Sequence, residues 1–285
     1  MSDSYPPPNL HGKTALVTGA SRGVGRGIAE VLGQAGATVF VTGRSTTKRP
    51  DRENLPGTVE ETAELVTQAG GKGIPVICDH TNDKDIDHLF AQIRHEDNKI
   101  DILVNNVWGG YELHNETFED PFWEQNLARW DGMFVAGLRA HFTASQLAAP
   151  LMIAKSSGLI INISSGDQGK FLQTTMYDTA KVAIDRLAFG MAQELRKYGI
   201  AALSLHPGWV RTERVLKAME GASQEELASS HSPQYVGRAI AALATDPNIM
   251  EKSGKALQVG EVAKSFNFTD IDGRYIPPFR IPDYA

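Results

Sequence analysis

Short apolar runs alternate with longer amphipathic stretches along most of the chain. The apolar runs are five to seven residues long and are mostly rich in β-branched residues, which is typical of strands. Between most of them, apolar positions recur every three or four residues, as on the buried face of a helix. The pattern predicts strands at residues 14–18, 38–42, 74–78, 101–106, 158–164, 201–207 and 254–259, and helices at residues 24–35, 58–69, 83–95, 122–154 and 175–198.

This alternation predicts the fold class. Nearly continuous apolar strands are buried on both faces, and strands that alternate with helices form a parallel sheet covered on both sides. No segment between the predicted elements has the length and composition of an interdomain linker. We therefore predict an α/β fold with a doubly wound, Rossmann-type parallel sheet, organised as a single domain over residues 1–285.

Three segments are candidates for loops that shape a binding site. Residues 44–57 and 107–121 follow predicted strand ends, and residues 213–232 form a candidate flap. In open α/β sheets, ligands bind beyond the carboxyl ends of the strands. We therefore expect 44–57 to lie beside the site, and 107–121 and 213–232 to act as substrate loops.

The segment after the first predicted strand, TGASRGVGRGI, is rich in glycine. Glycine permits a tight turn and a close approach of the backbone to a ligand, and the following helix presents unpaired amides to an anion. A glycine-rich turn without a ligand is the plain alternative. The place of the segment, at the first strand-to-helix junction, favours a phosphate-binding loop formed by Gly19, Gly23, Gly25 and Gly27.

The residue at the end of the second predicted strand indicates which nicotinamide dinucleotide, NAD or NADP, is bound. An acidic residue there binds the ribose 2′-hydroxyl of NAD, whereas an arginine accommodates the 2′-phosphate of NADP. The sequence is VTGRS, with Arg44 in place of an acid, and Arg22 in the glycine loop adds a second cation. Because guanidinium groups bind phosphate bidentately, we predict NADP(H). Lys48 and Arg49 are expected to be solvated loop charges.

Tyr177 and Lys181 stand four residues apart in a predicted helix and therefore share one face. A phenol with a pKa of about 10 is a poor acid at neutral pH unless an ammonium group stabilises its phenolate. The strand GLIINISSG brings Ser164 and Ser165 to a carboxyl edge just upstream, where a hydroxyl can hold a carbonyl oxygen. Tyrosine, lysine and serine suffice for carbonyl reduction, although a Tyr–Lys pair also occurs on solvated helix faces.

Together these motifs resemble those of the short-chain dehydrogenase/reductase family over nearly all of residues 10–260. TGASRGVG matches the family's TGxxxGxG, NISS followed by YDTAK matches its serine and YxxxK, and HPGWVRT matches its PGxVxT. The resemblance implies that Ser165 is the catalytic serine, with Ser164 as the alternative. It also implies that Tyr177 is the general acid and that Lys181 lowers the pKa of the tyrosine and binds the nicotinamide ribose.

The same resemblance implies the contacts to the cofactor. Asp79 would meet the adenine, and Asn105 would lie beside the adenosine ribose. Val210 and Thr212 would contact the nicotinamide carboxamide. The implied cofactor-binding residues are Gly19, Ser21, Arg22, Gly23, Val24, Gly25, Arg44, Asp79, Asn105, Tyr177, Lys181, Pro207, Gly208, Val210 and Thr212.

The sequence departs from the family pattern at two places near the predicted site. The usual NNAG is NNVW, so that Val107 and Trp108 replace a small pair. The helix position that commonly holds a catalytic asparagine is Gly137, so no asparagine can be assigned to a proton relay; a glycine could preserve a helix irregularity that lets water reach the lysine. These departures resemble one branch of the family, the dehydrogenase/reductase short-chain family member 1 proteins and their bacterial relatives.

Aromatic and apolar residues in the substrate loops favour a particular substrate class. A bulky, apolar ketone, aldehyde or cyclic carbonyl compound suits such surroundings. At least half of these side chains are nevertheless expected to pack the loops onto the sheet. The residues in question are Trp108, Tyr111, Phe118, Phe122, Trp123, Leu216 and Met219.

Composition excludes several function classes. The formal net charge is −6 without a basic stripe, which gives no support to nucleic-acid binding. No apolar run reaches the ~20 residues of a membrane span, and the start lacks a secretory signal, so we expect a cytoplasmic protein. The single cysteine, Cys78, is expected to be a buried structural thiol. His114, His141 and His206 lack metal-ligand spacing, so no metal is predicted.

These observations predict an NADPH-dependent carbonyl reductase that transfers hydride to a small-molecule ketone or aldehyde. An NAD-dependent alcohol dehydrogenase with the same site is one alternative. A catalytically silent, cofactor-sensing protein, in which NNVW and Gly137 abolish chemistry, is another. The family resemblance further implies a homodimer or homotetramer built on the helices at 122–154 and 175–198.

Overall fold

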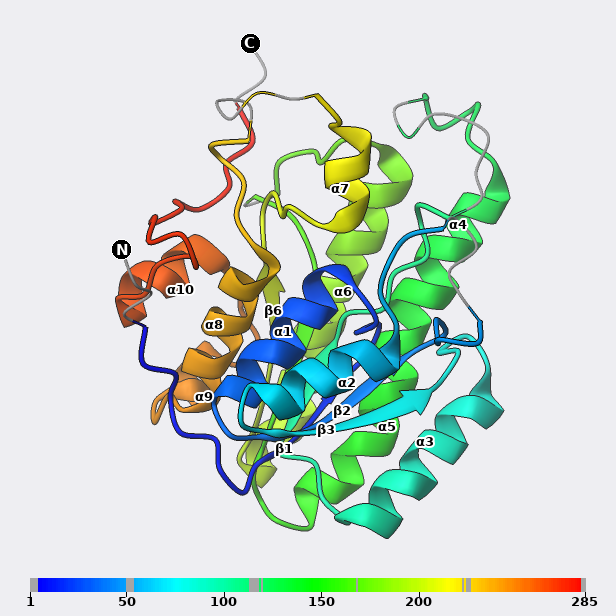
Figure 1. The fold of residues 1–285 in the computed structure, drawn as a ribbon. Coiled ribbons are helices and arrows are strands. Elements are labelled where there is room, and N and C mark those ends of the chain that lie inside the picture. The colour runs from blue at the N-terminus through cyan, green and yellow to red at the C-terminus, as the bar shows by residue number, and fades with distance from the viewer. Residues whose placement is uncertain are drawn as a thin grey trace.

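In the computed structural model, one parallel sheet runs through the middle of the protein (Figure 1). The structure describes residues 5–49, 54–112, 118, 120–167, 169–221, 223 and 227–282. Seven strands pair in the order β3-β2-β1-β4-β5-β6-β7, which confirms the predicted fold class. They are β1 (Thr14–Val17), β2 (Thr38–Gly43), β3 (Lys72–Ile77), β4 (Ile102–Asn105), β5 (Gly158–Ile163), β6 (Ile200–His206) and β7 (Ala256–Gln258).

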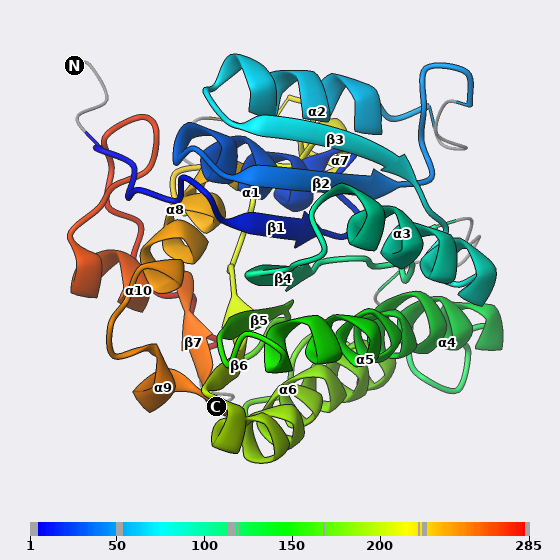
Figure 2. The same ribbon diagram turned by 90° about the horizontal axis from the view of Figure 1, so that it is seen from below.

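Helices cover both faces of the sheet (Figure 2). One face carries α1 (Gly23–Gln34), α2 (Val59–Gln68) and α8 (Pro233–Ala244). The other face carries α3 (Asp83–Glu96), α5 (Ala140–Ile153) and α6 (Thr175–Leu195). Four short helices complete the part of the chain that the structure describes: α4 (Leu127–Met133), α7 (Glu213–Ala218), α9 (Ile249–Lys252) and α10 (Val259–Phe266).

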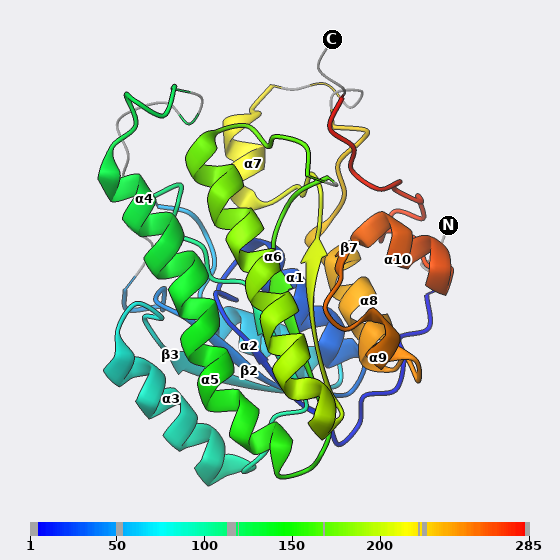
Figure 3. The same ribbon diagram turned by 180° about the vertical axis from the view of Figure 1, so that it is seen from behind.

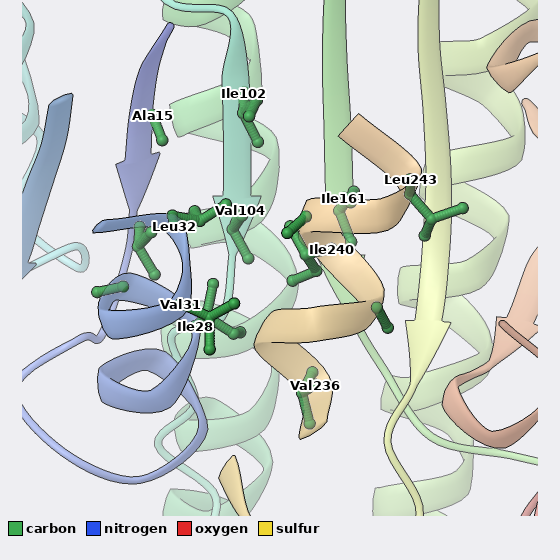
Figure 4. Close-up of a cluster of buried hydrophobic side chains, with 14 of the residues drawn as sticks. Ala15, Ile28, Val31, Leu32, Ile102, Val104, Ile161, Val236, Ile240 and Leu243 are labelled. Carbon is green, nitrogen blue, oxygen red and sulfur yellow. The ribbon is translucent and has the colours of Figure 1, made fainter. Parts of the chain in front are cut away.

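The core on the α1 face is built from apolar side chains of two helices and the central strands. Ile28 and Leu32 of α1 and Ile240 of α8 are fully buried there and project toward the sheet (Figure 4). A Cβ atom added at Gly27 would lie 2.4 Å from the backbone of Pro233. Because no side chain fits in that gap, the glycine lets α1 and α8 pack closely, and α1 is thereby fixed at the edge of the predicted site.

Several predictions of secondary structure need correction. The helix predicted over 122–154 begins only at Leu127, and a π-helical segment, Phe134–Arg139, interrupts it. Helix α8 was not predicted, although its apolar residues recur with a helical period. The last predicted strand ends at Gln258, where α10 begins. Short α7 and α9 were also missed, since a few residues carry little periodicity.

The carboxyl ends of all seven strands point to the same edge because every pairing is parallel. The chain after β2, the described start of the loop after β4 and helix α7 all lie at that edge (Figure 1), as predicted for the long segments. Across the described ranges, no helix has both the length and the apolar character that a bilayer span requires.

Candidate functional site

Two adjoining hollows lie at the carboxyl edge of the sheet, with volumes of about 470 and 780 Å³. The smaller hollow is lined by the glycine loop and the ends of β2 and β3, and the larger by the ends of β5 and β6 and the start of α6. Val24, Asn106, Trp108 and Thr212 line both, so the two form one continuous cleft. Its size and its position at the strand ends are typical of a small-molecule site.

The glycine loop lines the smaller hollow. A Cβ atom added at Gly25 would lie 2.4 Å from the carbonyl oxygen of Gly19 and 2.6 Å from the side-chain amide of Asn106. Helix α1 begins at Gly23, so its first amides face the hollow. Amides at the start of a helix bind anions, and the predicted residues Ser21, Arg22, Gly23 and Val24 all line this space.

Arg22 crosses from the glycine loop to the end of β2. Its guanidinium donates hydrogen bonds to Ser45 Oγ at 2.8 Å and to the carbonyl oxygens of Pro56 and Gly57 at 3.0 and 3.1 Å. Arg44 lines the same hollow. Both predicted cations therefore line the smaller hollow.

The Arg44 guanidinium pairs with two carboxylates. It donates two hydrogen bonds to the carboxylate of Glu112, at 2.5 and 2.7 Å, and lies 4.0 Å from the carboxylate of Asp79. Asp79 lines the same hollow. Burial raises the pKa of Asp79, but hydrogen bonds from Thr81 and the charges of Arg44 and His80 more than offset this and leave the pKa below its ordinary value.

Asn105 does not lie where the family resemblance implies. Its side chain is fully buried and donates hydrogen bonds to Ser145 Oγ and Asn162 Oδ1, both at 2.9 Å. The cleft is lined instead by Asn106, whose amide donates to the carbonyl oxygens of Thr18 and Gly19 at 3.0 Å. Successive residues of a strand point to opposite faces, so the prediction for the Asn105 side chain was wrong.

Tyr177, Lys181 and Ser165 come together in the larger hollow. Thr174 caps the start of α6 through a hydrogen bond to its side-chain oxygen from the Tyr177 amide, so both predicted residues lie in the first two turns. Tyr177, Lys181 and Ser165 line this hollow together with Tyr111. Ser164 is buried and donates to the Lys181 carbonyl oxygen at 3.0 Å, which leaves Ser165 as the serine that faces the phenol.

Burial controls the protonation of this group. It lowers the pKa of the Lys181 ammonium from 10.5 to about 7, and the Asp185 carboxylate offsets only part of that shift. It also raises the pKa of Tyr177 above 10.0, although hydrogen bonds with Tyr111 and Ser165 lower it in part. The net shift of the phenol is opposite to the lowering that the resemblance implies, because the loss of solvation prevails. Such a phenol keeps its proton at neutral pH.

Trp108 fills the space beside Gly137. A Cβ atom at Gly137 would lie 2.9 Å from two carbons of the indole ring, so an asparagine would not fit there. The Lys181 Nζ lies 3.7 Å from the centre of the same ring, within the range of a cation–π interaction. The suggested helix irregularity is present as the π-helical segment Phe134–Arg139, but the indole, rather than open space, adjoins the glycine.

The outer walls of the larger hollow come from β6 and the C-terminal segment. Val210 and Thr212 follow β6 and line the hollow, as do Pro207 and Gly208. The C-terminal residues 276–280 form the opposite wall. Asp167 fixes this wall by accepting hydrogen bonds from the Ile281 amide at 2.9 Å and from Arg280 at 3.2 Å. Most of the hollow's lining surface is apolar.

The remaining predictions concern histidine, cysteine and metal. His206 hydrogen-bonds with Asp185 at 3.0 Å and with the Gly166 carbonyl at 3.1 Å, a structural role. His141 lies 3.1 Å from the Val107 carbonyl, and His114 lies outside the described residues. Burial, with the charges of Asp85 and Asp79, raises the pKa of Cys78 to about 12, so the thiol is inert. No metal-binding group occurs among the residues that the structure describes.

Several residues of the cleft were not assigned a role from the sequence. Tyr111 was noted only as an aromatic loop residue, and Glu112, Glu213 and Phe279 were not singled out. Phe279 lies in the segment IPPFRIP, whose prolines indicate an extended chain that could have suggested a wall. Glu112 and Glu213 carry no local pattern, because their partners are distant in sequence.

Comparisons with known proteins agree with this geometry. A sequence model described as short chain dehydrogenase matches residues 13–222. The chain is 37% identical to mouse dehydrogenase/reductase SDR family member 1 over 97% of this chain and 88% of the mouse protein, which confirms the predicted branch. A crystal structure from Xanthomonas campestris has a TM-score of 0.81 at 25% identity, covering 97% of this chain and all of that one. A 7α-hydroxysteroid dehydrogenase complexed with NADH and 7-oxoglycochenodeoxycholic acid has a TM-score of 0.71 at 28% identity, covering 88% of this chain and 93% of that one.

Proposed function

Because the chain belongs to the short-chain dehydrogenase/reductase family, we propose that it is an NADPH-dependent carbonyl reductase. An oxidoreductase that acts on a hydroxyl or carbonyl group follows from the family itself. The observation that carries the proposal is the buried Tyr177, which shares the larger hollow with Ser165 and lies beside Lys181. This group adjoins a cleft with two arginines at its far end.

The chain's own residues fit a dinucleotide phosphate. Gly25 leaves no room for a side chain where the backbone must approach the pyrophosphate, and the α1 amides point to the same place. Arg22 and Arg44 would hold the 2′-phosphate between them, with Ser45 beside Arg22. Bound in this way, the cofactor would supply hydride to the substrate carbonyl.

The catalytic residues then act on the carbonyl oxygen. Ser165 positions that oxygen through its hydroxyl, and Tyr177 donates the proton that the developing alkoxide takes. The raised pKa of the phenol keeps the proton in place until the reaction needs it. Lys181 lies 5.4 Å from the Tyr177 ring centre and places its amine beside the phenol, where a positive charge favours proton release in the transition state.

The substrate is a bulky, apolar ketone or aldehyde. Trp108, Tyr111 and Phe118 surround the Tyr177 ring at centre-to-centre distances of 5.5, 6.3 and 5.3 Å. Phe279 adds to the opposite wall. Aromatic walls of this kind bind alicyclic or aromatic groups by contact area rather than by hydrogen bonds. The structural neighbour crystallised with a 7-oxo bile acid is consistent with such a substrate.

NADPH oxidation against a panel of aromatic and alicyclic ketones tests the proposal. Replacement of Tyr177 by Phe keeps the ring packing but removes the proton donor, so turnover should fall by about 10²–10⁴-fold. Tyr198→Phe removes the same hydroxyl from the turn just beyond the far end of α6; it is the matched control and should keep wild-type turnover. Equal activity of the Tyr177→Phe variant would exclude the proton-donor role. NADPH binding without turnover of any ketone would favour a silent sensing protein.

An NAD-dependent alcohol dehydrogenase is the second candidate. The pairing of Arg44 with Glu112 favours it, because a neutralised arginine attracts a 2′-phosphate less strongly. Titration of the wild-type protein with NADPH and NADH separates the two candidates. An Arg44→Asp variant should lose NADPH affinity and keep NADH affinity if Arg44 binds the 2′-phosphate. No preference in the wild-type protein would contradict NADPH dependence.

The protein is further proposed to be a homodimer or homotetramer built on α5 and α6, which lie side by side at one surface (Figure 3). Phe142 on α5 and Val182 and Phe189 on α6 are 48%, 54% and 37% exposed. Apolar side chains gathered on one face are typical of protein–protein contacts. Sedimentation equilibrium should give an oligomer for the wild-type protein and a smaller species for Phe142→Glu, whereas a monomeric wild-type protein would refute the proposal.

A further inference from the structure

Two carboxylates occupy the anion-binding groups of the dinucleotide cleft. Glu112 accepts two hydrogen bonds from Arg44, at 2.5 and 2.7 Å. Glu213 accepts a hydrogen bond from the Gly23 amide at 2.9 Å. Both side chains line the same hollow as the glycine loop. Neither comes from a strand: Glu112 follows β4 in a loop, and Glu213 is the first residue of α7.

The partners of the two carboxylates are the groups that a phosphorylated dinucleotide needs. The Gly23 amide belongs to the first turn of a twelve-residue helix, where the helix dipole favours a negative charge. The Arg44 guanidinium offers a bidentate fork that matches phosphate as well as carboxylate. An amide N–H makes one strong hydrogen bond at a time, and two anions on one fork repel each other.

We propose that Glu112 and Glu213 compete with the phosphate groups of the cofactor and thereby set the affinity and the selectivity of the cleft. Glu112 competes with the 2′-phosphate for Arg44, and Glu213 competes with the pyrophosphate for the Gly23 amide. The assignment of Glu112 rests on the proposed use of NADP. The assignment of Glu213 does not, because NAD carries the same pyrophosphate.

The two carboxylates should have different signatures. Removal of the Glu112 charge should strengthen binding only of the cofactor with a 2′-phosphate, because only that group requires Arg44. Removal of the Glu213 charge should strengthen binding of both cofactors to the same extent. Side chains in the Arg44–Glu112 pair are 39% and 29% exposed, so water screens the charges and each gain should be about two- to fivefold in Kd.

Titration of fluorescence with NADPH and with NADH tests the proposal directly and does not require a substrate. The variants are Glu112→Gln and Glu213→Gln, which keep the side-chain shape and remove the charge. Glu96→Gln is the control, because the substitution removes the same charge. Glu96 is the last residue of α3, lies near the opposite edge of the sheet and pairs with Lys72. Far-ultraviolet circular dichroism and thermal unfolding establish that each variant is folded.

The expected result is a lower Kd for NADPH alone in Glu112→Gln, a lower Kd for both cofactors in Glu213→Gln and unchanged values in Glu96→Gln. Unchanged or weaker NADPH binding in Glu112→Gln, in a folded protein that prefers NADPH, would overturn the competition at Arg44. Unchanged or weaker binding of both NADPH and NADH in Glu213→Gln would overturn the competition at the Gly23 amide. Failure of the wild-type protein to prefer NADPH would instead contradict the proposed cofactor.

Discussion

The loop after β1 and the loop after β4 both line the cleft, but they contribute to it differently. The glycine loop after β1 presents backbone, and its contacts depend on the absence of side chains at positions such as Gly25. The loop after β4 presents bulk, with Trp108 against Lys181 and Tyr111 against the ring of Tyr177. The first loop can be recognised from its glycine spacing, whereas the second depends on which side chains it meets in space. The same site therefore has one half that follows a motif and one half particular to this chain.

The loop after β4 encloses a buried charge, and the largest predicted effect follows from it. Burial lowers the pKa of Lys181 from 10.5 to about 7, so the unfolded chain binds more protons between these pH values. The stability that Lys181 contributes is therefore greatest at high pH and is lost as the pH falls through this window. The Lys181→Met variant has no ionisable group at position 181, so its stability should lack this pH dependence.

Chemical denaturation of the wild-type protein and of Lys181→Met at pH 7 and pH 10 measures the effect. We compare the free energy of unfolding of the variant with that of wild type at each pH. The difference, variant minus wild type, should be about 3 kcal/mol larger at pH 7 than at pH 10, because only the wild-type protein loses stability as the pH falls. Lys197→Met, at the end of α6, serves as the matched control. A relative stability that does not change with pH would mean that the Lys181 charge is not buried.

The glycine loop should fail when a single methyl group is added. In Gly25→Ala the new Cβ would meet the Gly19 carbonyl oxygen and the Asn106 amide at 2.4 and 2.6 Å, and overpacking of this kind costs about 1–3 kcal/mol. Because the strain falls on the phosphate-binding backbone, the Kd for the dinucleotide should rise by about 5- to 150-fold.

Gly190→Ala is the control for that substitution. Gly190 lies within α6, and a Cβ atom added there would have no neighbour within 4 Å in the described part of the chain, apart from the backbone of its own helix. Alanine is favoured over glycine in a helix by about 1 kcal/mol, so this variant should be slightly more stable and bind the cofactor normally. Wild-type cofactor affinity in Gly25→Ala would show that the loop does not need a bare backbone at this position.

A smaller effect tests the packing of Trp108 on Gly137. Gly137→Ala places a methyl group 2.9 Å from the indole and should destabilise the protein by about 1–2 kcal/mol. In a Trp108→Leu background the same substitution should cost less, because the ring is gone. A double-mutant cycle on urea unfolding measures the coupling. If Gly137→Ala costs the same stability in both backgrounds, positions 108 and 137 are not energetically coupled.

Much of the fold could be predicted because its signals are local. The strands have β-rich compositions and the main helices have clear periods, and parallel pairing then brings all strand ends to one edge. Helix α8 carries a helical period as well but was not assigned from the sequence. The predicted triad came together because Tyr177 and Lys181 share a helix face and Ser165 follows a neighbouring strand.

The sequence by itself determined the sheet, the glycine loop and the pairing of Tyr177 with Lys181, since spacing along a strand or helix fixes such positions. The choice of Ser165 over Ser164 came from the structure, in which the Ser164 hydroxyl donates to the Lys181 carbonyl oxygen. Only the tertiary structure decided that Asn105 turns into the protein, that the indole of Trp108 takes the place beside Gly137, and that carboxylates sit on Arg44 and Gly23. The pKa values belong to the second group as well. These features depend on burial and on partners brought together from distant parts of the chain, which no local pattern encodes.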